Sequence, residues 1–533
     1  MDQAAQPPLR PAAAGPAWEA LDLAVREANP QPLDARDVTA LLESMGWTDR
    51  QATERFGYTD LFAMGTAMYQ GMPDIRRVEP PMQPSIPWYA MVWRVVMQFP
   101  HGLAFALPII ISFSSMLVLH ISLSSYLYFN VLQATALALA VFLSFLATGG
   151  IVQAMANSVL LFLNMREMAL ARTTAWRLMR WGLIVAVALA AVLLVGDVLI
   201  PVLPLQLVLF MDVYLILLAA MWLAFASLYI LRSELYLTAI TAGGILVAFG
   251  LWRAGFPVVL AQAIALVAAA LSSLGTAIIL LARLGRRNPE RARFVQPRTS
   301  QLAYIAWPYY LYGTMYFVFI FIDRVVAWST NGAYMPYYIW FRGQYELGMD
   351  WALLALVLPL GTVEVLVHYV VNWVQSNQHA LPAARAAEFS QRLRGVYLQC
   401  LGVYGIAAFA AVILTRLVIG WARAIPLIAS ALPTVSVEPF VFHLATVAYI
   451  LLAASLFNVL VMFSLGVPWQ PLRLLAVAGA VDFGLGLVLT RVTGQYQYAV
   501  LGLLAGTGFL AVASTRGILR VFSDVDYLLF RMV

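Results

Sequence analysis

The chain of 533 residues contains no lysine, and all 32 of its basic residues are arginines. Without lysine it can neither carry a phosphate-binding loop of the G-x-x-x-x-G-K type nor form a Schiff base through a lysine amine. Cysteine is almost absent too, because Cys400 is the only one. This excludes disulfides within the chain and any metal site built from several thiolates. Cys400 lies in an apolar stretch, where we expect a small core residue.

Charged residues are scarce as well. They make up 11% of the chain while apolar residues make up 62%, and a water-soluble globule of this length could not hide so much apolar surface. Enzyme signatures are missing: His101, His120, His379 and His443 are scattered, and no H-E-x-x-H or G-x-S-x-G motif occurs. The composition predicts an all-α polytopic membrane protein that is not an enzyme and needs no cofactor or metal.

Twelve apolar segments have the length of a membrane span, since a hydrocarbon core of about 30 Å takes roughly 20 helical residues. The predicted spans are Gly102–Ser122, Val131–Leu160, Trp181–Val202, Val208–Leu231, Leu235–Trp252, Phe256–Ala282, Leu302–Ile322, Trp351–Val374, Val396–Leu414, Phe440–Leu465, Leu474–Thr490 and Tyr498–Leu519. With the amino terminus in the cytoplasm, 26 of the 32 arginines fall on the cytoplasmic side. This bias predicts a multi-pass protein of the inner (cytoplasmic) membrane with both termini in the cytoplasm.

An arginine-rich cytoplasmic linker, residues 285–300, divides the spans into two sets of six. The transmembrane halves, residues 86–284 and 301–533, then share one orientation and are expected to be parallel repeats with a cavity between them. In the first half, Ile86–Phe99 carries Trp88, Tyr89 and Trp93. Such aromatic residues predict a helix at the lipid headgroups, which turns into the bilayer at Pro100.

Residues 1–85 differ from the rest, with seven arginines against twelve acidic residues. No basic stretch followed by an apolar run opens the chain, so this segment is expected to stay in the cytoplasm. Capping and glycine patterns predict four short helices, Trp18–Arg26, Asp34–Ser44, Thr48–Phe56 and Thr59–Tyr69, with Asp34, Thr48 and Thr59 as N-caps. The segment is either a small helical domain that docks a partner or a folded cap.

Ionisable residues inside an apolar span are costly and therefore indicate function. Glu364, His368 and Asn372 follow one another at four-residue intervals near the centre of the eighth span, so they share one helical face. A carboxylate and an imidazole one turn apart could exchange a proton during transport, or they could form a packing pair. Asp212 and Asp482 are weaker candidates, because each lies near a predicted span end.

Other polar residues within the spans are expected to hold helices together rather than to bind cargo, namely Gln153, Asn157, Gln262 and Asn458. No arginine falls at the predicted centre of a span, whereas the most central charge is acidic. We therefore expect a cavity that prefers neutral or cationic cargo, an expectation that arginines lining the cavity would contradict.

Two six-span halves fit the major facilitator architecture or the multidrug/oligosaccharidyl-lipid/polysaccharide (MOP) flippase architecture. The first usually has a G-x-x-x-D-R-x-G-R-R-like loop after its second span, and LNMREMALARTTAWRLMR has none. The segments YFVFIFIDRVVAW (Tyr316–Trp328) and YELGMDWALLALVLPLGTVE (Tyr345–Glu364) resemble those of the inner-membrane exporter family of the Pel exopolysaccharide system, which is MOP-like. The resemblance implies export of a polysaccharide or lipid-linked saccharide by alternating access, beside a cytoplasmic glycosyltransferase.

On this reading Glu364, His368 and Asn372 form the coupling or cargo face, and Asp323 acts at the outer mouth. The expected partners are membrane lipid, the saccharide cargo and polysaccharide-synthesis proteins, and no nucleic acid. Two alternatives stay open. One is a cation-coupled efflux carrier for small cationic compounds, and the other is a membrane scaffold that recruits a glycosyltransferase without transporting anything.

Overall fold

The computed structural model describes residues 15–29, 32, 34–72, 84–126, 128–201, 203–286, 298–330, 338–377, 386–425 and 437–524. In these residues all regular structure is helical, apart from one isolated antiparallel bridge between Ile121 and Tyr126. The chain divides into two compact units, one within residues 1–82 and the other within residues 83–533. Most of the arginine-rich linker predicted at residues 285–300 lies outside the described residues.

The amino-terminal unit consists of four short helices, α1 (Pro16–Ala28), α2 (Ala35–Ser44), α3 (Asp49–Phe56) and α4 (Leu61–Gly71). Asp34 and Thr48 cap α2 and α3 as predicted, and Thr48 forms a capping box with Gln51. The cap of α4 is Asp60, whose carboxylate accepts the N–H of Ala63, and not Thr59 as predicted. These helices enclose a small apolar core of their own.

The second unit contains twelve long helices in its described residues: α5 (Trp88–Leu119), α6 (Val131–Asn164), α7 (Met168–Leu199), α8 (Leu205–Ile230), α9 (Glu234–Arg253), α10 (Val258–Arg286), α11 (Thr299–Trp328), α12 (Gly343–Asn377), α13 (Ala386–Ala422), α15 (Val437–Ser464), α16 (Trp469–Thr493) and α17 (Ala499–Val521). Eleven are long and apolar enough to cross a membrane, and the twelfth, α5, carries a shorter apolar stretch, Leu107–Leu119. The predicted all-α, twelve-span architecture is confirmed.

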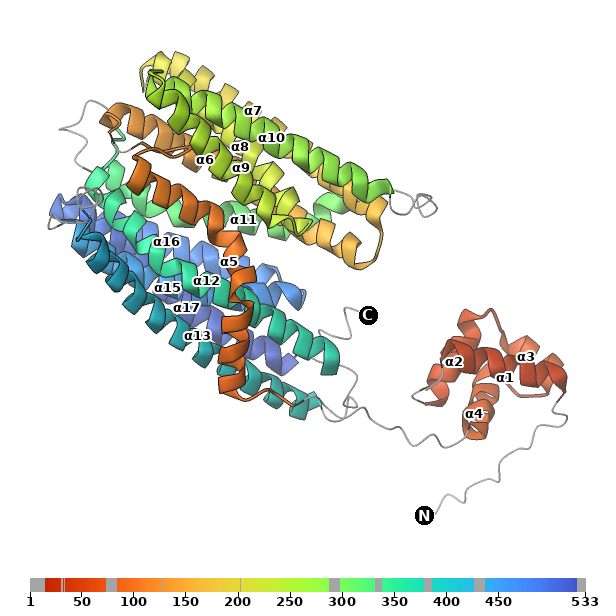
Figure 1. Cartoon of the computed structure of the whole chain (residues 1–533). Coiled ribbons are helices and arrows are strands. Elements are labelled where there is room, and N and C mark those ends of the chain that lie inside the picture. Colours follow the sequence, from red (N-terminus) through yellow and green to blue (C-terminus); the bar gives the residue numbers. More distant parts are fainter. Residues whose placement is uncertain are drawn as a thin grey trace. The chain divides into compact units, whose positions relative to one another are not determined.

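Helix α5 corrects one expectation. Its backbone is helical without a break through Pro100, where we predicted that an interfacial helix would end. Figure 1 shows that the helix changes direction along its length instead. Proline inside a helix removes a hydrogen bond and bends the backbone, and Pro100 and Pro108 both lie in α5.

Helices α6–α10 and α12–α17 form two groups that lie side by side in Figure 1, and α5 runs from the first group across the second. The packing inside the groups repeats. Helix α6 packs on α7 and α8 while α10 packs on α8 and α9, and in the same way α12 packs on α13 and α15 while α17 packs on α15 and α16. Between the groups, α5 packs on α12 as α11 packs on α6. The described helices thus form two halves of the same topology.

The halves come close together where α6 crosses α11. A Cβ atom on Gly313 would lie 2.5 Å from the carbonyl oxygen of Gly149, and one on Gly150 would lie 2.6 Å from that of Tyr310. Only glycine permits such proximity of the two backbones. One turn away, the rings of Phe145 and Phe317 stack with centroids 4.7 Å apart.

Candidate functional site

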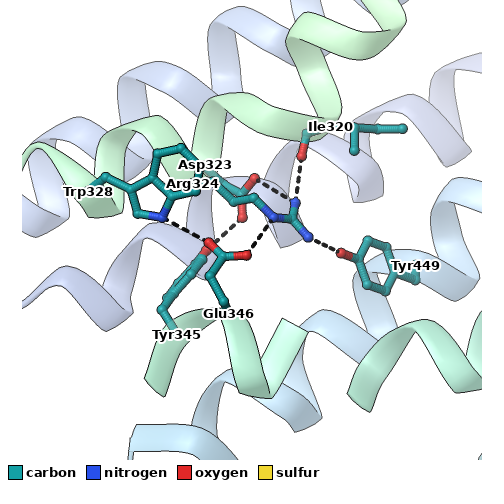
Figure 2. A network of polar contacts seen from close by, with 7 residues as sticks. All are labelled: Ile320, Asp323, Arg324, Trp328, Tyr345, Glu346 and Tyr449. Carbon is teal, nitrogen blue, oxygen red and sulfur yellow. Dashed lines mark hydrogen bonds and ion pairs between the residues drawn. The ribbon is translucent and has the colours of Figure 1, made fainter. Parts of the chain in front are cut away.

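The main cluster of buried charges lies in the second half, where α11, α12 and α15 meet (Figure 2). Asp323 and Arg324 come from the end of α11, Glu346 from the first turn of α12, and Tyr449 from the middle of α15. Helices α6 and α12 begin at this end of the bundle. We call it the outer end, following the orientation predicted from the arginines.

Arg324 occupies the centre of this cluster and is 6% exposed. Its Nε donates to the Glu346 carboxylate at 3.1 Å, its Nη1 to the carbonyl of Ile320 at 2.9 Å, and its Nη2 to the hydroxyl of Tyr449 at 2.9 Å. The other oxygen of Glu346 accepts the indole N–H of Trp328 at 2.9 Å. A guanidinium whose donors point in several directions holds three helices together, which the single ammonium of a lysine could not do.

Asp323 is fully buried beside this guanidinium. Its Oδ2 accepts a 2.6 Å hydrogen bond from the hydroxyl of Tyr345. Its Oδ1 lies 3.7 Å from Nη1 of Arg324 and has no hydrogen-bond partner among the described residues. Asp323 therefore lies at the outer end of the bundle but is buried inside the second half.

Asp482 is the second carboxylate of the site, and it too is fully buried. It lies in the middle of α16, not near a span end as predicted. Neither of its oxygens has a hydrogen-bond partner among the described residues. Gly502 and Gly506 of α17 make room for it, since Cβ atoms there would lie 2.8 Å from Oδ1 and 3.0 Å from Cβ of Asp482. Asp482 interacts electrostatically with both Asp323 and Arg324.

The site contains more negative than positive charge. The guanidinium of Arg324 faces three carboxylates, those of Asp323, Glu346 and Asp482. Asp350, one turn after Glu346 on α12, adds another carboxylate. Burying an unpaired carboxylate costs several kcal/mol unless a proton or a bound cation neutralises it. The arrangement can therefore take up protons or a cation inside the second half.

The predicted coupling or cargo face on α12, formed by Glu364, His368 and Asn372, lies outside this cluster of buried charges. Tyr229, near the end of α8, donates to the carboxylate of Glu364 at 3.5 Å, and Arg232, Glu234 and His368 interact with it electrostatically. Glu364 thus lies beside the end of α8, about one turn past the middle of α12 in the direction of the predicted cytoplasmic end.

The rest of that face is exposed in the described structure. His368 contacts the backbone carbonyl of Glu364 at 3.0 Å and not its carboxylate, and the side chain of Asn372 is exposed. The three residues share a helical side, but no bonded triad joins them. A proton exchange between the side chains of Glu364 and His368 has no direct hydrogen bond to use here.

Asp212 lies on α8 in the first half, remote in sequence from both clusters. It is 7% exposed, and its Oδ1 has no hydrogen-bond partner among the described residues. Two other predictions fit the role of holding helices together. Gln262 donates to the carbonyls of Ser122 and Ser125, and Asn458 bridges Tyr397 to Ser514.

No group of three or more histidine, cysteine, aspartate or glutamate side chains among the described residues could hold a metal ion. The sequence-based reasoning missed Arg324 and Glu346, because the apolar span was ended at Ile322 and the next begun at Trp351. It missed Tyr449 as well, which lies inside the predicted span Phe440–Leu465. Arg324 is buried near the end of α11 and not at a span centre, so the expected preference of the cavity for neutral or cationic cargo stays a prediction. An Asp-Arg pair next to an apolar span and a Tyr-Glu pair before the next one were the available signals.

No family model matches the sequence, and no curated protein matches it either. Solved structures do. An outward-facing multidrug resistance MATE family transporter of the MOP superfamily is similar with a TM-score of 0.54 at 12% identity, over 83% of this chain and 99% of that one. The inward-facing conformation of a multidrug resistance MATE family transporter has a TM-score of 0.53 at 14% identity, over 82% and 98% of the two chains.

A third similar structure is a MOP superfamily transporter from Pyrococcus furiosus whose binding pocket is described as having reverse polarity. Its TM-score is 0.51 at 12% identity, over 83% of this chain and 99% of that one. At such identities the likeness shows the fold alone. The chain is a multi-pass membrane protein with the fold of MATE-type transporters of the MOP superfamily.

Proposed function

We propose that this chain is an ion-coupled MOP-type transporter that exports a polysaccharide or lipid-linked saccharide across the inner membrane by alternating access. The fold supports transport. The cargo rests on the resemblance of residues 316–328 and 345–364 to the Pel exporter family. Asp323, Tyr345 and Glu346 from these segments belong to one buried network, so the resembling residues are also the ones that build the site.

The observation that carries ion coupling is the state of Asp482. A fully buried carboxylate with two unpartnered oxygens, next to a second carboxylate, destabilises the fold unless something neutralises it. Such a residue is retained at this cost when its charge changes during the work of the protein. In the proposed mechanism Asp323 and Asp482 carry the coupling proton or cation, and Glu364 with His368 and Asn372 acts nearer the cytoplasm. Asp212 is a further candidate in the first half.

The second candidate function is efflux of small cationic compounds. It is favoured by the likeness to structures described as multidrug resistance transporters and by the excess of carboxylates over guanidinium groups in the buried site. Both functions share the coupling site and differ in cargo. For the first, a cytoplasmic glycosyltransferase and the acidic amino-terminal unit are the proposed means by which cargo is delivered.

The test is Asp482→Asn, which keeps the shape of the side chain and removes its charge. Export of cell-surface polysaccharide is measured in a deletion strain that expresses the variant at the normal protein level. Loss of polysaccharide supports saccharide export, and loss of resistance to cationic dyes with unchanged polysaccharide supports efflux. Asn458→Asp places a carboxylate at a buried position of another helix, α15, and in the Asp482→Asn background it should not restore activity. Normal export and normal resistance in Asp482→Asn would refute coupling at this residue.

A further inference from the structure

Polar contacts between the two halves occur at both ends of the bundle. At the outer end, the backbone N–H of Phe341, just before α12, donates to the hydroxyl of Thr135 in α6 at 3.0 Å. Towards the predicted cytoplasmic end, the hydroxyl of Tyr229 in α8 donates to Glu364 in α12 at 3.5 Å. Each of these two contacts joins a helix of the first half to α12 or its leading segment in the second half. Ile86, just before α5, also donates to the hydroxyl of Tyr369 in α12 at 3.2 Å and accepts from Gln399 in α13 at 2.6 Å.

The outer contact is well enclosed. Thr135 is 1% exposed, and its hydroxyl also donates to the carbonyl of Val131, so it acts as donor and acceptor at once. Breaking the contact leaves the N–H of Phe341 without this acceptor. A buried N–H group without a partner costs free energy, and this cost favours the state in which the contact is formed.

The inner contact lies among charges from both halves. Glu364 faces Arg232 and Glu234 from the α8–α9 connection and His368 from its own helix. At 3.5 Å the contact between the Tyr229 hydroxyl and the Glu364 carboxylate is longer than a strong hydrogen bond to a carboxylate. Neutralising Glu364 or removing the hydroxyl of Tyr229 weakens this contact without changing the apolar packing around it.

The crossing of α6 and α11 at Gly149 and Gly313 lies between the two contacts. Thr135 precedes Gly149 by 14 residues of α6, a distance of about 21 Å along a helix. Phe317 packs directly beside Gly149, and Tyr310 packs beside the glycine that follows it. We take the close approach of the two backbones as the pivot about which each half rocks.

We propose that Thr135 with Phe341 and Tyr229 with Glu364 are two latches, each of which holds one end of the bundle closed. This rests on the proposed alternating access and specifies which residues hold each end. Releasing the inner latch opens the cytoplasmic end, and releasing the outer latch opens the other end. The two releases have opposite effects on the same equilibrium.

Electron–electron distance measurements on the full chain test this without knowledge of the cargo. In a Cys400→Ser background, spin labels at Met165 and Ser376 report the predicted cytoplasmic end, and labels at Leu199 and Val492 report the outer end. All four positions are exposed in the structure. Each pair has one label in each half, and none of the four residues belongs to a latch.

Tyr229→Phe and Glu364→Gln are each expected to lengthen the inner distance and to leave the outer one unchanged or shorter. Thr135→Val, with Thr135→Ala as the second variant, is expected to lengthen the outer distance. Matched controls are Tyr214→Phe and Thr148→Val, whose hydroxyls donate to carbonyls within the first half, and these should move neither distance.

Latch variants whose distances equal those of the controls would overturn the proposal, and so would an inner variant that opens the outer end. The result is independent of the export assay. Unchanged distances with lost polysaccharide in Asp482→Asn would remove the latches and leave the proposed function standing. Changed distances in the latch variants, with normal polysaccharide and normal dye resistance in Asp482→Asn, would support the latches and refute coupling at Asp482.

Discussion

Arg324 is a single residue that links the stability of the second half to the proposed ion coupling. Its guanidinium is the only positive charge in a cluster that contains Asp323, Glu346 and Asp482. It pairs with the first two and leaves the third without a hydrogen-bond partner. Among these three carboxylates, Asp482 is therefore the one without an ion pair in the described structure, whereas Asp323 belongs both to the ion pair with Arg324 and to the proposed coupling site.

Arg324→Met tests the structural part. Removing one partner of a buried ion pair leaves uncompensated carboxylates and costs about 3–5 kcal/mol. We expect a large fall in the melting temperature of the purified protein and a low yield. Arg491→Met is the control, because Arg491 is exposed and makes one hydrogen bond to Ser329, so its loss should cost less than about 1 kcal/mol. Equal melting temperatures for the two variants would show that the network is not needed for stability.

The same residue shows where reasoning from sequence stopped. Hydropathy ended the seventh span at Ile322 and began the eighth at Trp351, whereas α11 continues to Trp328 and α12 begins at Gly343. The polar residues in these extensions satisfy one another across helices. A pattern read along one segment cannot detect such pairing, because it exists only after the helices have packed. Asp482 was undervalued because it was placed near a span end, although it is the central residue of the predicted span Leu474–Thr490.

At the scale of elements, the hydropathy pattern predicted the number of long helices and their division into two sets of six, because each apolar run of sufficient length has few stable alternatives in a bilayer. The path of α5 was harder to predict. Pro100 is typical of a helix end in water-soluble proteins, but here the helix continues through it. Neighbouring helices stabilise such a bent segment, and their contribution is invisible in the sequence of α5 alone.

The crossing of α6 and α11 yields a prediction at this scale. In Gly313→Ala the new Cβ would meet the carbonyl oxygen of Gly149 at 2.5 Å, and backbone cannot yield as a flexible side chain would. We expect a loss of about 1–3 kcal/mol from overpacking, seen as a lower melting temperature. Gly275→Ala in α10 is the matched control, because no atom lies within 4 Å of its added Cβ and alanine favours a helix by roughly 0.5–1 kcal/mol. A Gly313→Ala protein as stable as this control would exclude a tight crossing.

At the scale of the whole molecule, the chain combines two units stabilised by different means. The membrane unit places apolar side chains outwards as well as inwards. In the most apolar stretch of α7, for example, only 17% of the residues are buried in the protein. The amino-terminal unit instead hides a small core from water, with Val25, Val38, Leu42 and Met64 fully buried. A unit with its own core and its own helix caps is expected to fold without the other.

Tyr58 makes this expectation measurable. Its side chain is buried against Trp18, with ring centroids 5.7 Å apart, and its hydroxyl has no hydrogen-bond partner among the described residues. Burial raises the pKa of Tyr58 above its usual value. The unfolded chain therefore releases this proton first, so the stability is complete below about pH 10 and falls as the pH rises towards the pKa of the folded unit.

For isolated residues 1–82 we expect cooperative unfolding by urea and a free energy of unfolding that decreases between about pH 9 and 11. Tyr58→Phe should be more stable by about 1 kcal/mol, because it buries no unpartnered hydroxyl, and should lose less stability over that range. Circular dichroism at several pH values measures both effects, with Tyr69→Phe as the control for the loss of a tyrosine. If residues 1–82 unfold without a cooperative transition, the unit depends on the membrane part of the chain, and a role as an independent docking domain is excluded.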